Sequence, residues 1–163
     1  MNSITVNTPI GYLHICEENG KIASITYKEQ YTEPHGTETA VLAMAKQQLQ
    51  EYFNGERKAF DLPLKITGSD FTAKVLTQLA KVPYGQTITY GQLAEKAGSK
   101  GAARAVGTVM RKNKFVIVLP CHRVLPQGNK LGNYSAGGPA NKEWLLTLEK
   151  QNSFNMFFNL INQ

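Results

Sequence analysis

The chain has 163 residues, a net charge of +6 and a hydrophobic content of 42%, values typical of a soluble globular protein with one large or two small domains. No stretch approaches the ~20 apolar residues of a membrane-spanning helix, and the N-terminal sequence lacks the basic and apolar regions of a secretory signal. Two cysteines, Cys16 and Cys121, are too few for a disulfide framework. These features predict a cytoplasmic protein without a membrane partner.

Charge is distributed unevenly along the chain. Residues 1–68 hold six Lys and Arg against eight Asp and Glu, a net −2, whereas residues 69–163 hold twelve against four, a net +8. From Lys96 to Lys142 there are nine basic residues and no acidic one. A solvated basic face is the simpler explanation, but so long a stretch without an acid favours a polyanionic partner, of which nucleic acid is the commonest.

The first part of the chain has the pattern of a β-meander followed by a helix. Three short β-rich runs, separated by turn residues, occupy 3–7, 12–17 and 22–27. Residues 37–56 carry apolar side chains at helical spacing, and Asn54-Gly55 supplies a stop signal. A short strand is expected at 60–66. The turn at 67–70, where the charge changes sign, is the expected domain boundary.

The second part of the chain begins with helical patterns. Residues 69–82 are predicted to form a capped helix with one apolar side. A short extended stretch and two short helices are then expected at 87–90, 91–98 and 102–113. Two short helices joined by a few residues that include Gly suggest a helix–turn–helix, and the second is the basic one. Its small residues suit either close helix packing or a close approach to a DNA groove.

An apolar run, FVIVLPCHRV, occupies residues 115–124. Its Val and Ile content predicts a buried strand that ends near Pro120, because proline cannot donate to a sheet. Cys121 is therefore expected at the end of a strand, amid positive charge that would favour the thiolate. A Gly-rich loop at 132–140 and a helix at 141–149 follow. The helix is expected to face inward with Trp144, Leu145 and Leu148.

Chemistry alone leaves Cys121 open between a small core residue and a nucleophile. A histidine next in sequence rarely points to the same place as its neighbour, so help from His122 is expected through a water or a local bend. Cys16, in an alternating strand, is interpreted as a buried structural residue. His14 and Cys16 share one strand face, but a structural zinc needs four ligands and only His35 remains in that half, so no metal is expected.

Four blocks of sequence resemble the O6-alkylguanine-DNA alkyltransferases, also called methylated-DNA–protein-cysteine methyltransferases. They are YGQTITYGQLAEKAG, AARAVGTVMRKN, VLPCHRV and GNYSAGG…KEWLLTLE, in the family's order and close to its spacings. The resemblance is strong over 70–150 and looser over the N-terminal part, where NTPIGYLHI is similar. It implies an α/β (α+β) fold. A ribonuclease H-like β-meander plus helix is expected over 1–68, and a winged helix–turn–helix-like domain with a short extra tail over 69–163.

The resemblance also implies the reacting groups. Cys121 resembles the alkyl acceptor, and His122 resembles the residue that takes the thiol proton through a water. Glu149 resembles the carboxylate that orients this histidine. Tyr90 resembles the tyrosine that rotates the DNA phosphate and assists the leaving guanine. Arg104 resembles the arginine that fills the gap left by a flipped nucleotide.

Other matched positions concern support and DNA contact. Asn113 resembles a hinge asparagine that follows the recognition helix, and Arg123 resembles a buried structural arginine. Tyr134 and Ser135 resemble loop residues that close on the guanine. The residues expected at the DNA surface beside Arg104 are Lys100, Ala102 and Ala103.

The implied activity is a single-turnover DNA repair reaction, with O6-alkylguanine in double-stranded DNA as substrate, no cofactor and a monomeric protein. The O6 atom lies inside the duplex, so the base must be turned out, and displacement of an alkyl group from oxygen calls for a soft nucleophile such as a thiolate. Three alternatives stay open: a lesion-sensing module without transfer, a transcription regulator with a structural cysteine, and a cysteine hydrolase. The first of these is disfavoured by Cys121.

The chain departs from the family pattern in two places. The loop at 136–141 is one residue longer, with an added Pro139, so the range of alkyl groups accepted stays open. The tail at 151–163 matches no family feature. Its apolar residues have helical spacing and can fold back on the body; they are Phe154, Phe157, Phe158 and Ile161.

Overall fold

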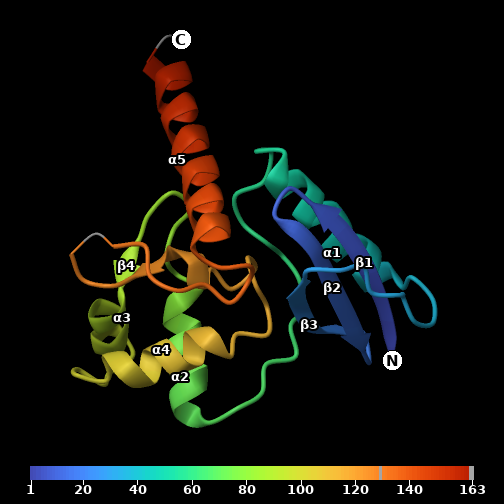
Figure 1. Ribbon diagram of the computed structural model, residues 1–163, viewed down its shortest axis with the longest axis horizontal. Coiled ribbons are helices and arrows are strands. Elements are labelled where there is room, and N and C mark those ends of the chain that lie inside the picture. Colours follow the sequence, from blue (N-terminus) through green and yellow to red (C-terminus); the bar gives the residue numbers. More distant parts are fainter. Residues whose placement is uncertain (129, 162–163) are drawn as a thin grey trace.

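The N-terminal half of the computed structural model is an antiparallel β-meander (Figure 1). Its three strands pair in the order β1-β2-β3, with bounds Asn2–Thr8, Gly11–Glu18 and Lys21–Lys28. Buried Leu13 and Ile15 alternate along β2 with side chains of the opposite face. Asn19 and Gly20 form the turn into β3 with φ of 53° and 79°, values that these two residue types adopt at low cost. The predicted meander is confirmed.

Helix α1 (Ala40–Phe53) packs against all three strands. The Thr39 hydroxyl caps its first turn by accepting a hydrogen bond from the Leu42 N–H, and the predicted helix is confirmed. The strand expected at 60–66 is wrong. Leu64 makes an isolated bridge to Ile22, and Pro63, which has no N–H to donate, prevents a longer pairing.

Three helices and a small parallel pair of strands open the C-terminal half. The helices are α2 (Asp70–Leu79), α3 (Tyr90–Lys96) and α4 (Ala103–Arg111), and the strands are β4 (Ile88–Thr89) and β5 (Val124–Leu125). Helix α2 ends three residues before the predicted end at 82. Helices α3 and α4 pack together across the connection at 97–102, which contains Gly98 and Gly101. This is the predicted helix–turn–helix arrangement.

The strand expected before Cys121 is wrong. Phe115 makes one parallel bridge to Ile25 of β3, the chain then turns through Ile117 with φ of 72°, and Cys121–Arg123 forms the 3-10 helix η1. The run is buried, as expected, except for half-buried Val118. Continuous apolar character therefore indicated burial correctly but did not specify conformation. The bridge joins the two halves of the molecule.

Helix α5 (Pro139–Ile161) is longer than predicted, because the tail continues it. Leu145 is fully buried, but Trp144 is 37% exposed and lies against Phe53, with ring centroids 5.9 Å apart, so its expected inward position is wrong. Neighbouring helical residues point about 100° apart, and Leu145 takes the inward direction. The structure describes residues 1–128 and 130–161, with side chains through 153, so the predicted packing of the tail's apolar side chains lies outside it.

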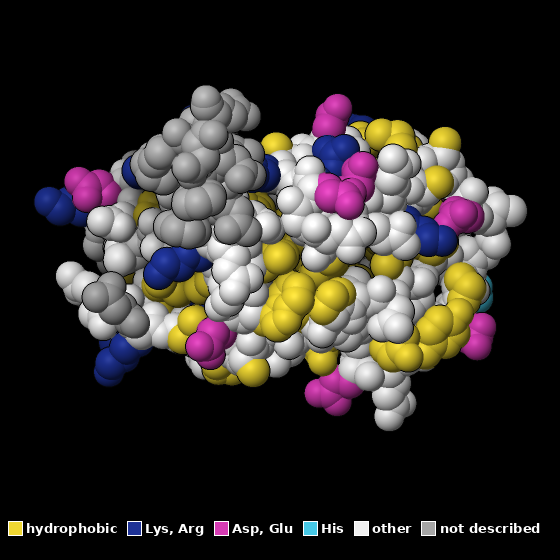
Figure 2. All heavy atoms as spheres, turned by 90° about the horizontal axis from the view of Figure 1, so that it is seen from above, with side chains coloured by type: hydrophobic (Ala, Val, Ile, Leu, Met, Phe, Trp, Pro, Cys, Tyr) yellow, Lys and Arg dark blue, Asp and Glu magenta, His cyan; other side chains and the backbone are white. Residues whose placement is uncertain are grey.

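One hydrophobic core extends through both halves. It includes Leu13 and Leu49 of the N-terminal half and Leu93 and Leu145 of the C-terminal half, all fully buried. Figure 2 shows a strip of hydrophobic side chains between the halves, and more Asp and Glu side chains over the N-terminal half on that face. Among the described residues, no helix is both long and apolar enough to span a membrane.

Candidate active site

A groove of about 1580 Å³ lies between α3, α4, the Gly-rich loop and the turn that carries Cys121. Its volume exceeds the range of typical small-molecule pockets, so it can accept more than one nucleobase. The predicted site residues that line it are Tyr90, Ala103, Arg104, Cys121, Tyr134 and Ser135. The predicted residues outside its lining are Lys100, Ala102, Asn113, His122 and Glu149. The groove therefore combines the expected acceptor with half of the expected DNA-contact residues.

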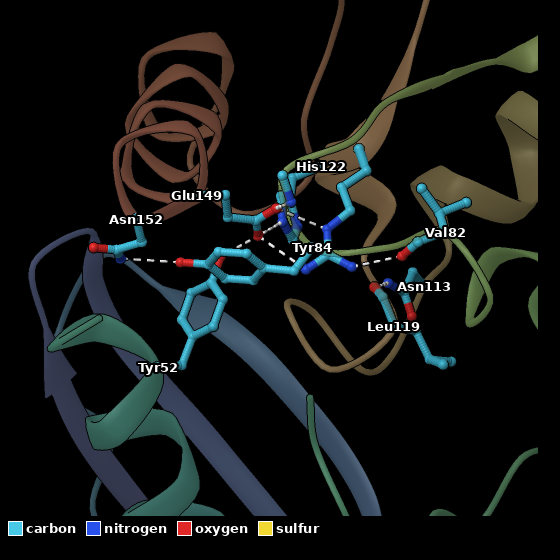
Figure 3. Close-up of polar contacts among 10 residues, drawn as sticks. Tyr52, Val82, Tyr84, Asn113, Leu119, His122, Glu149 and Asn152 are labelled. Carbon is cyan, nitrogen blue, oxygen red and sulfur yellow. Dashed lines mark hydrogen bonds and ion pairs between the residues drawn. The ribbon is translucent and has the colours of Figure 1, made fainter. Parts of the chain in front are cut away.

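Cys121 begins η1 directly after Pro120, and its backbone N–H donates to the Leu119 carbonyl at 2.8 Å. The side chain of Asn113 holds the preceding turn, because its Nδ2 donates to the Leu119 carbonyl at 2.9 Å and its Oδ1 accepts from the Phe115 N–H at 2.9 Å. Figure 3 shows Asn113 reaching Leu119. The amide thus fixes the position of the turn from which Cys121 projects.

The thiol of Cys121 is buried, with 4% of the residue exposed. Burial raises the pKa of this thiol, while hydrogen bonds from Asn113 and Ser135 and the charge of Lys142 oppose the rise. Nearby positive charge favours the thiolate, as expected, but the loss of hydration on burial outweighs it. The cysteine rests as a neutral thiol and needs a base at the moment of reaction.

His122 and Glu149 form a fully buried pair, with His122 Nε2 and Glu149 Oε2 2.6 Å apart. Burial lowers the pKa of His122 against the opposing effect of Glu149, so the ring is neutral near pH 7. An ionised carboxylate can only accept, so the ring proton belongs on Nε2. His122 Nδ1 is buried and has no hydrogen-bond partner among the described residues. This bare nitrogen is suited to take a proton.

Glu149 is held from two further sides. Arg123 donates from Nε to Oε1 at 2.8 Å and from Nη2 to Oε2 at 3.1 Å, and the Gly85 N–H donates to Oε1 at 3.2 Å. Arg123 Nη1 also donates to the Val82 carbonyl at 2.8 Å. Burial raises the pKa of Glu149, but His122 and Arg123 outweigh it and hold that pKa well below its usual range. The carboxylate therefore stays ionised and fixed in orientation.

Three hydroxyl groups face the groove or lie beneath it. Tyr134 is buried, its hydroxyl has no partner in the described part of the chain, and its ring centroid lies 6.4 Å from that of His122. Burial raises the pKa of both Tyr134 and half-buried Tyr90, so both stay phenols at neutral pH. Ser135 is exposed on the groove wall. These hydroxyls can donate to a bound base.

Helix α4 turns one face to the groove. Arg104 is exposed there, and Gly107 leaves room beside it. Two residues that the sequence had not singled out as site residues share this face: Thr108 accepts from Arg111 Nη2 at 3.0 Å, and both line the groove. The helical spacing of Arg104, Thr108 and Arg111 at intervals of four and three was the signal that could have found them.

Lys142 is a buried lysine that sequence reasoning missed. Its Nζ donates to the Val124 carbonyl at 2.7 Å and to the Asn133 carbonyl at 3.2 Å. Burial lowers its pKa to about 8, and ionisation of Cys121 would oppose this shift. The ammonium group joins the end of η1 to the loop that carries Tyr134. Lys142 lies three and seven residues before Leu145 and Glu149, and that helical spacing places all three on one face.

The longer loop is anchored at its end. Pro139 is the first residue of α5, where a missing N–H costs nothing, and it lines the groove. Asn141 Nδ2 donates to the carbonyls of Ile10 at 3.0 Å and Ala136 at 2.9 Å. These bonds attach the Gly-rich loop to the turn between β1 and β2.

The second cysteine lies in different surroundings. Cys16 is partly exposed on the face of β2 opposite Leu13, so its interpretation as a buried residue is wrong. His14 on the same face pairs through Nδ1 with the Thr5 hydroxyl at 3.1 Å. Within residues 1–128 and 130–153, no three His, Cys, Asp or Glu side chains form a group that could hold a metal ion.

Two family models match the chain. The model described as the DNA-binding domain of 6-O-methylguanine DNA methyltransferase matches residues 70–151, and the ribonuclease-like domain of the same enzyme matches residues 1–66. The chain belongs to the 6-O-methylguanine DNA methyltransferase family. This confirms the resemblance seen in the motifs.

Individual relatives and structures agree with this assignment. The constitutive methylated-DNA–protein-cysteine methyltransferase of Bacillus subtilis is 40% identical over 154 residues, which cover 90% of this chain and 93% of the relative. The structure of the Mycobacterium tuberculosis O6-methylguanine methyltransferase superposes with a TM-score of 0.83 at 36% identity, over 92% of this chain and 93% of that one. M. tuberculosis OGT in complex with DNA gives 0.82 at 38% identity, over 91% and 92%.

Proposed function

We propose that this chain repairs DNA by transferring the alkyl group of O6-alkylguanine irreversibly to Cys121. Membership of the family makes it a methyltransferase that acts on DNA through a cysteine. The observation that carries the assignment to Cys121 is its setting. Cys121 lines the groove, and the next residue of η1 is His122, with Nε2 bound to Glu149 and Nδ1 without a partner among the described residues.

The transfer follows from these groups. His122 Nδ1 takes the thiol proton through a water, and Glu149 stabilises the imidazolium that forms. The sulfur then attacks the alkyl carbon, an S–C bond forms, and the C–O6 bond breaks with its electron pair left on the guanine. Hydrogen bonds from Tyr90 and Ser135 relieve the charge on the departing base. The product thioether is stable, so each chain reacts once.

The shape and positive charge of the groove suit DNA as the partner. Arg104 and Arg111 lie along the same wall as the thiol, and small residues of α4 permit close approach to a narrow groove of the duplex. We propose that α4 enters from the minor-groove side and that Arg104 occupies the space of the nucleotide turned out toward Cys121. Arg104 would thus hold the duplex open during transfer.

The protein is proposed to act as a monomer, because Cys121, His122 and Glu149 meet within one chain and so need no partner to be assembled. A cytoplasmic setting suits an acceptor that must stay a free thiol, since oxidising compartments convert thiols to disulfides. Sedimentation of the protein alone and with a short duplex tests the monomer directly. A dimer that is required for repair would contradict it.

The test of the function uses duplex DNA that carries one O6-methylguanine, in excess over protein. Wild type should restore one guanine per chain and then stop. Cys121→Ser should restore none while binding the duplex with unchanged affinity, because a hydroxyl ionises too little to attack. Cys16→Ser is the matched control and should repair fully. Repeated turnover, or repair by Cys121→Ser, would contradict the proposal.

A further inference from the structure

Tyr52 of α1 reaches the same carboxylate oxygen as the histidine. Its hydroxyl donates to Glu149 Oε2 at 2.5 Å, and His122 Nε2 lies 2.6 Å from that atom. In Figure 3, Tyr52 rises from α1 toward Glu149, which descends from α5. The two partners are 97 residues apart in the chain, and both are fully buried.

This contact is distinctive because the N-terminal half contributes nothing to the lining of the groove, whose residues all lie within 89–139. In the part of the chain that the structure describes, Glu149 has one hydrogen-bond partner from the N-terminal half, which is Tyr52. Its other partners are His122, Arg123 and Gly85 of the C-terminal half. The hydroxyl thus connects the first half of the chain to the groups that activate the thiol.

The direction of this hydrogen bond is fixed by charge. Burial, and then the charge of Glu149, raise the pKa of Tyr52 well above its usual value, so the side chain stays a phenol. Glu149 stays ionised, so it accepts from both neighbours. With the phenol and the imidazole N–H both donating to Oε2, the carboxylate cannot turn away, and the ring proton of His122 stays on Nε2.

We propose that Tyr52 is a positioning residue for alkyl transfer: its hydroxyl fixes Glu149 and thereby keeps His122 Nδ1 bare to receive the thiol proton. The inference rests on the proposed role of His122. The hydrogen bond also spreads the negative charge of Glu149, which limits how strongly the carboxylate stabilises a protonated His122. The N-terminal half therefore takes part in thiol activation through one hydroxyl group.

Other charged and titratable groups surround this pair and are common to the variants below. They are Arg123 and Cys121 of η1, Tyr134 of the loop, Lys142 of α5 and Tyr84 before β4. Tyr84 offers a matched control. Its ring lies 6.1 Å from that of Tyr52, yet its hydroxyl accepts from Asn152 Nδ2 at 3.0 Å and makes no hydrogen bond to Glu149.

The test is single-turnover repair of an O6-methylguanine duplex across pH 5.5 to 9. Tyr52→Phe should slow transfer about tenfold at neutral pH, because Glu149 can then turn away and no longer holds His122 Nδ1 in place to receive the thiol proton; a factor of this size corresponds to about one hydrogen bond to a charged group. The acid limb of its rate profile should move to higher pH, because an unshared Glu149 charge makes His122 easier to protonate. Duplex affinity should not change, and Tyr84→Phe should retain the wild-type profile.

A Tyr52→Phe profile that superimposes on that of wild type would overturn the inference. Failure of the proposed function looks different, because wild type itself would then transfer no methyl group. A second measurement needs no variant of Tyr52. Nitrogen NMR of histidine-labelled protein should show His122 protonated on Nε2 alone at neutral pH, with His14→Asn and His35→Asn used for assignment. A proton on Nδ1 instead would also overturn the inference.

Discussion

Each half of the molecule holds one free cysteine. The two cysteines differ in burial, in access to the groove and in the side chains around them. Cys16 lies partly exposed on a strand in the acidic half, on the same face as His14. Cys121 is buried in the basic half, yet it opens onto a groove and precedes a histidine bound to an ionised carboxylate. Exposure alone would favour Cys16. If Cys121 is the acceptor, as proposed, then a positioned base and a substrate groove matter more than accessibility in selecting it.

The halves also contribute unequally to the site. Every residue that lines the groove comes from 89–139, whereas the N-terminal half supports the site from behind through Tyr52 and through the Ile10 carbonyl. On the proposed roles, binding and chemistry are concentrated in one half, and the orientation of the base depends on both. Substitutions can separate these contributions.

The largest effect is expected at Glu149, where the halves meet. Glu149→Gln should lower the free energy of unfolding by about 3–5 kcal/mol, because it leaves Arg123 buried without its ionic partner. It should also abolish rapid transfer. Glu143→Gln, on the exposed face of the same helix, should change stability by less than about 0.5 kcal/mol. Urea unfolding measures both, and equal stabilities would refute the account of this buried pair.

Arg104→Ala should separate DNA opening from chemistry. Holding a base out of the stack costs a few kcal/mol, so the variant should lose a comparable amount of transition-state stabilisation on duplex DNA. Reaction with free O6-benzylguanine should change little, since a free base has no stack to open. Single-turnover rates on the two substrates give the comparison. Similar losses on both would place Arg104 in the pocket or in folding instead.

Acidification should weaken the buried pair in two stages. The pKa of His122 is lower in the folded state than in the unfolded chain. As the pH falls through the unfolded-state pKa of about 6.5, the unfolded chain therefore binds a proton first and the folded state loses stability. Glu149, whose pKa is also lowered, adds a further loss below about 4.3. Each stage costs about 1.4 kcal/mol per pH unit while it lasts. His122→Gln should remove the first stage and reduce the second, which Arg123 alone then maintains, as unfolding from pH 7 to 3 can show.

The smallest effect concerns the charge difference between the halves. Arg111→Ala should reduce the salt dependence of duplex binding by about 0.9 in the log–log slope, one phosphate contact. Lys46→Ala is the matched change in the N-terminal half, where Lys46 is paired with Glu38 at 3.8 Å, and it should leave the slope as in wild type. Fluorescence titration at several salt concentrations measures both slopes. Equal reductions would remove the distinction between the halves.

The parts of the fold that depend on local patterns were predictable. The three strands, α1 and the pair α3–α4 follow from alternation, helical spacing and turn residues. The segment before Cys121 was not, because a continuous apolar run is compatible with strand or turn, and the positive φ of Ile117 depends on its surroundings. The inward position predicted for Trp144 was wrong for a related reason. Helical spacing cannot decide which of two adjacent residues, Trp144 or Leu145, faces the core.

The candidate site was predictable where motifs carry it and hidden where it depends on distant contacts. One groove is lined by four of the residues that the motifs indicated, although nothing in their spacing along the chain required them to lie together: Tyr90, Arg104, Cys121 and Tyr134. Tyr52 read as an ordinary helix residue, because its partner lies 97 residues away. The positive charge near Cys121 is visible in the sequence, but the burial that raises the pKa of its thiol is not.

The most direct test of the central claim compares the two cysteines in one experiment. Wild-type protein is incubated with duplex DNA carrying a single O6-methylguanine, digested with trypsin and analysed by mass spectrometry. We expect peptide 115–123, which contains Cys121, to gain the mass of one methyl group in place of hydrogen in every reacted chain. Peptide 1–21, which contains Cys16, should gain none. Methylation of peptide 1–21 with peptide 115–123 unchanged would contradict the central claim.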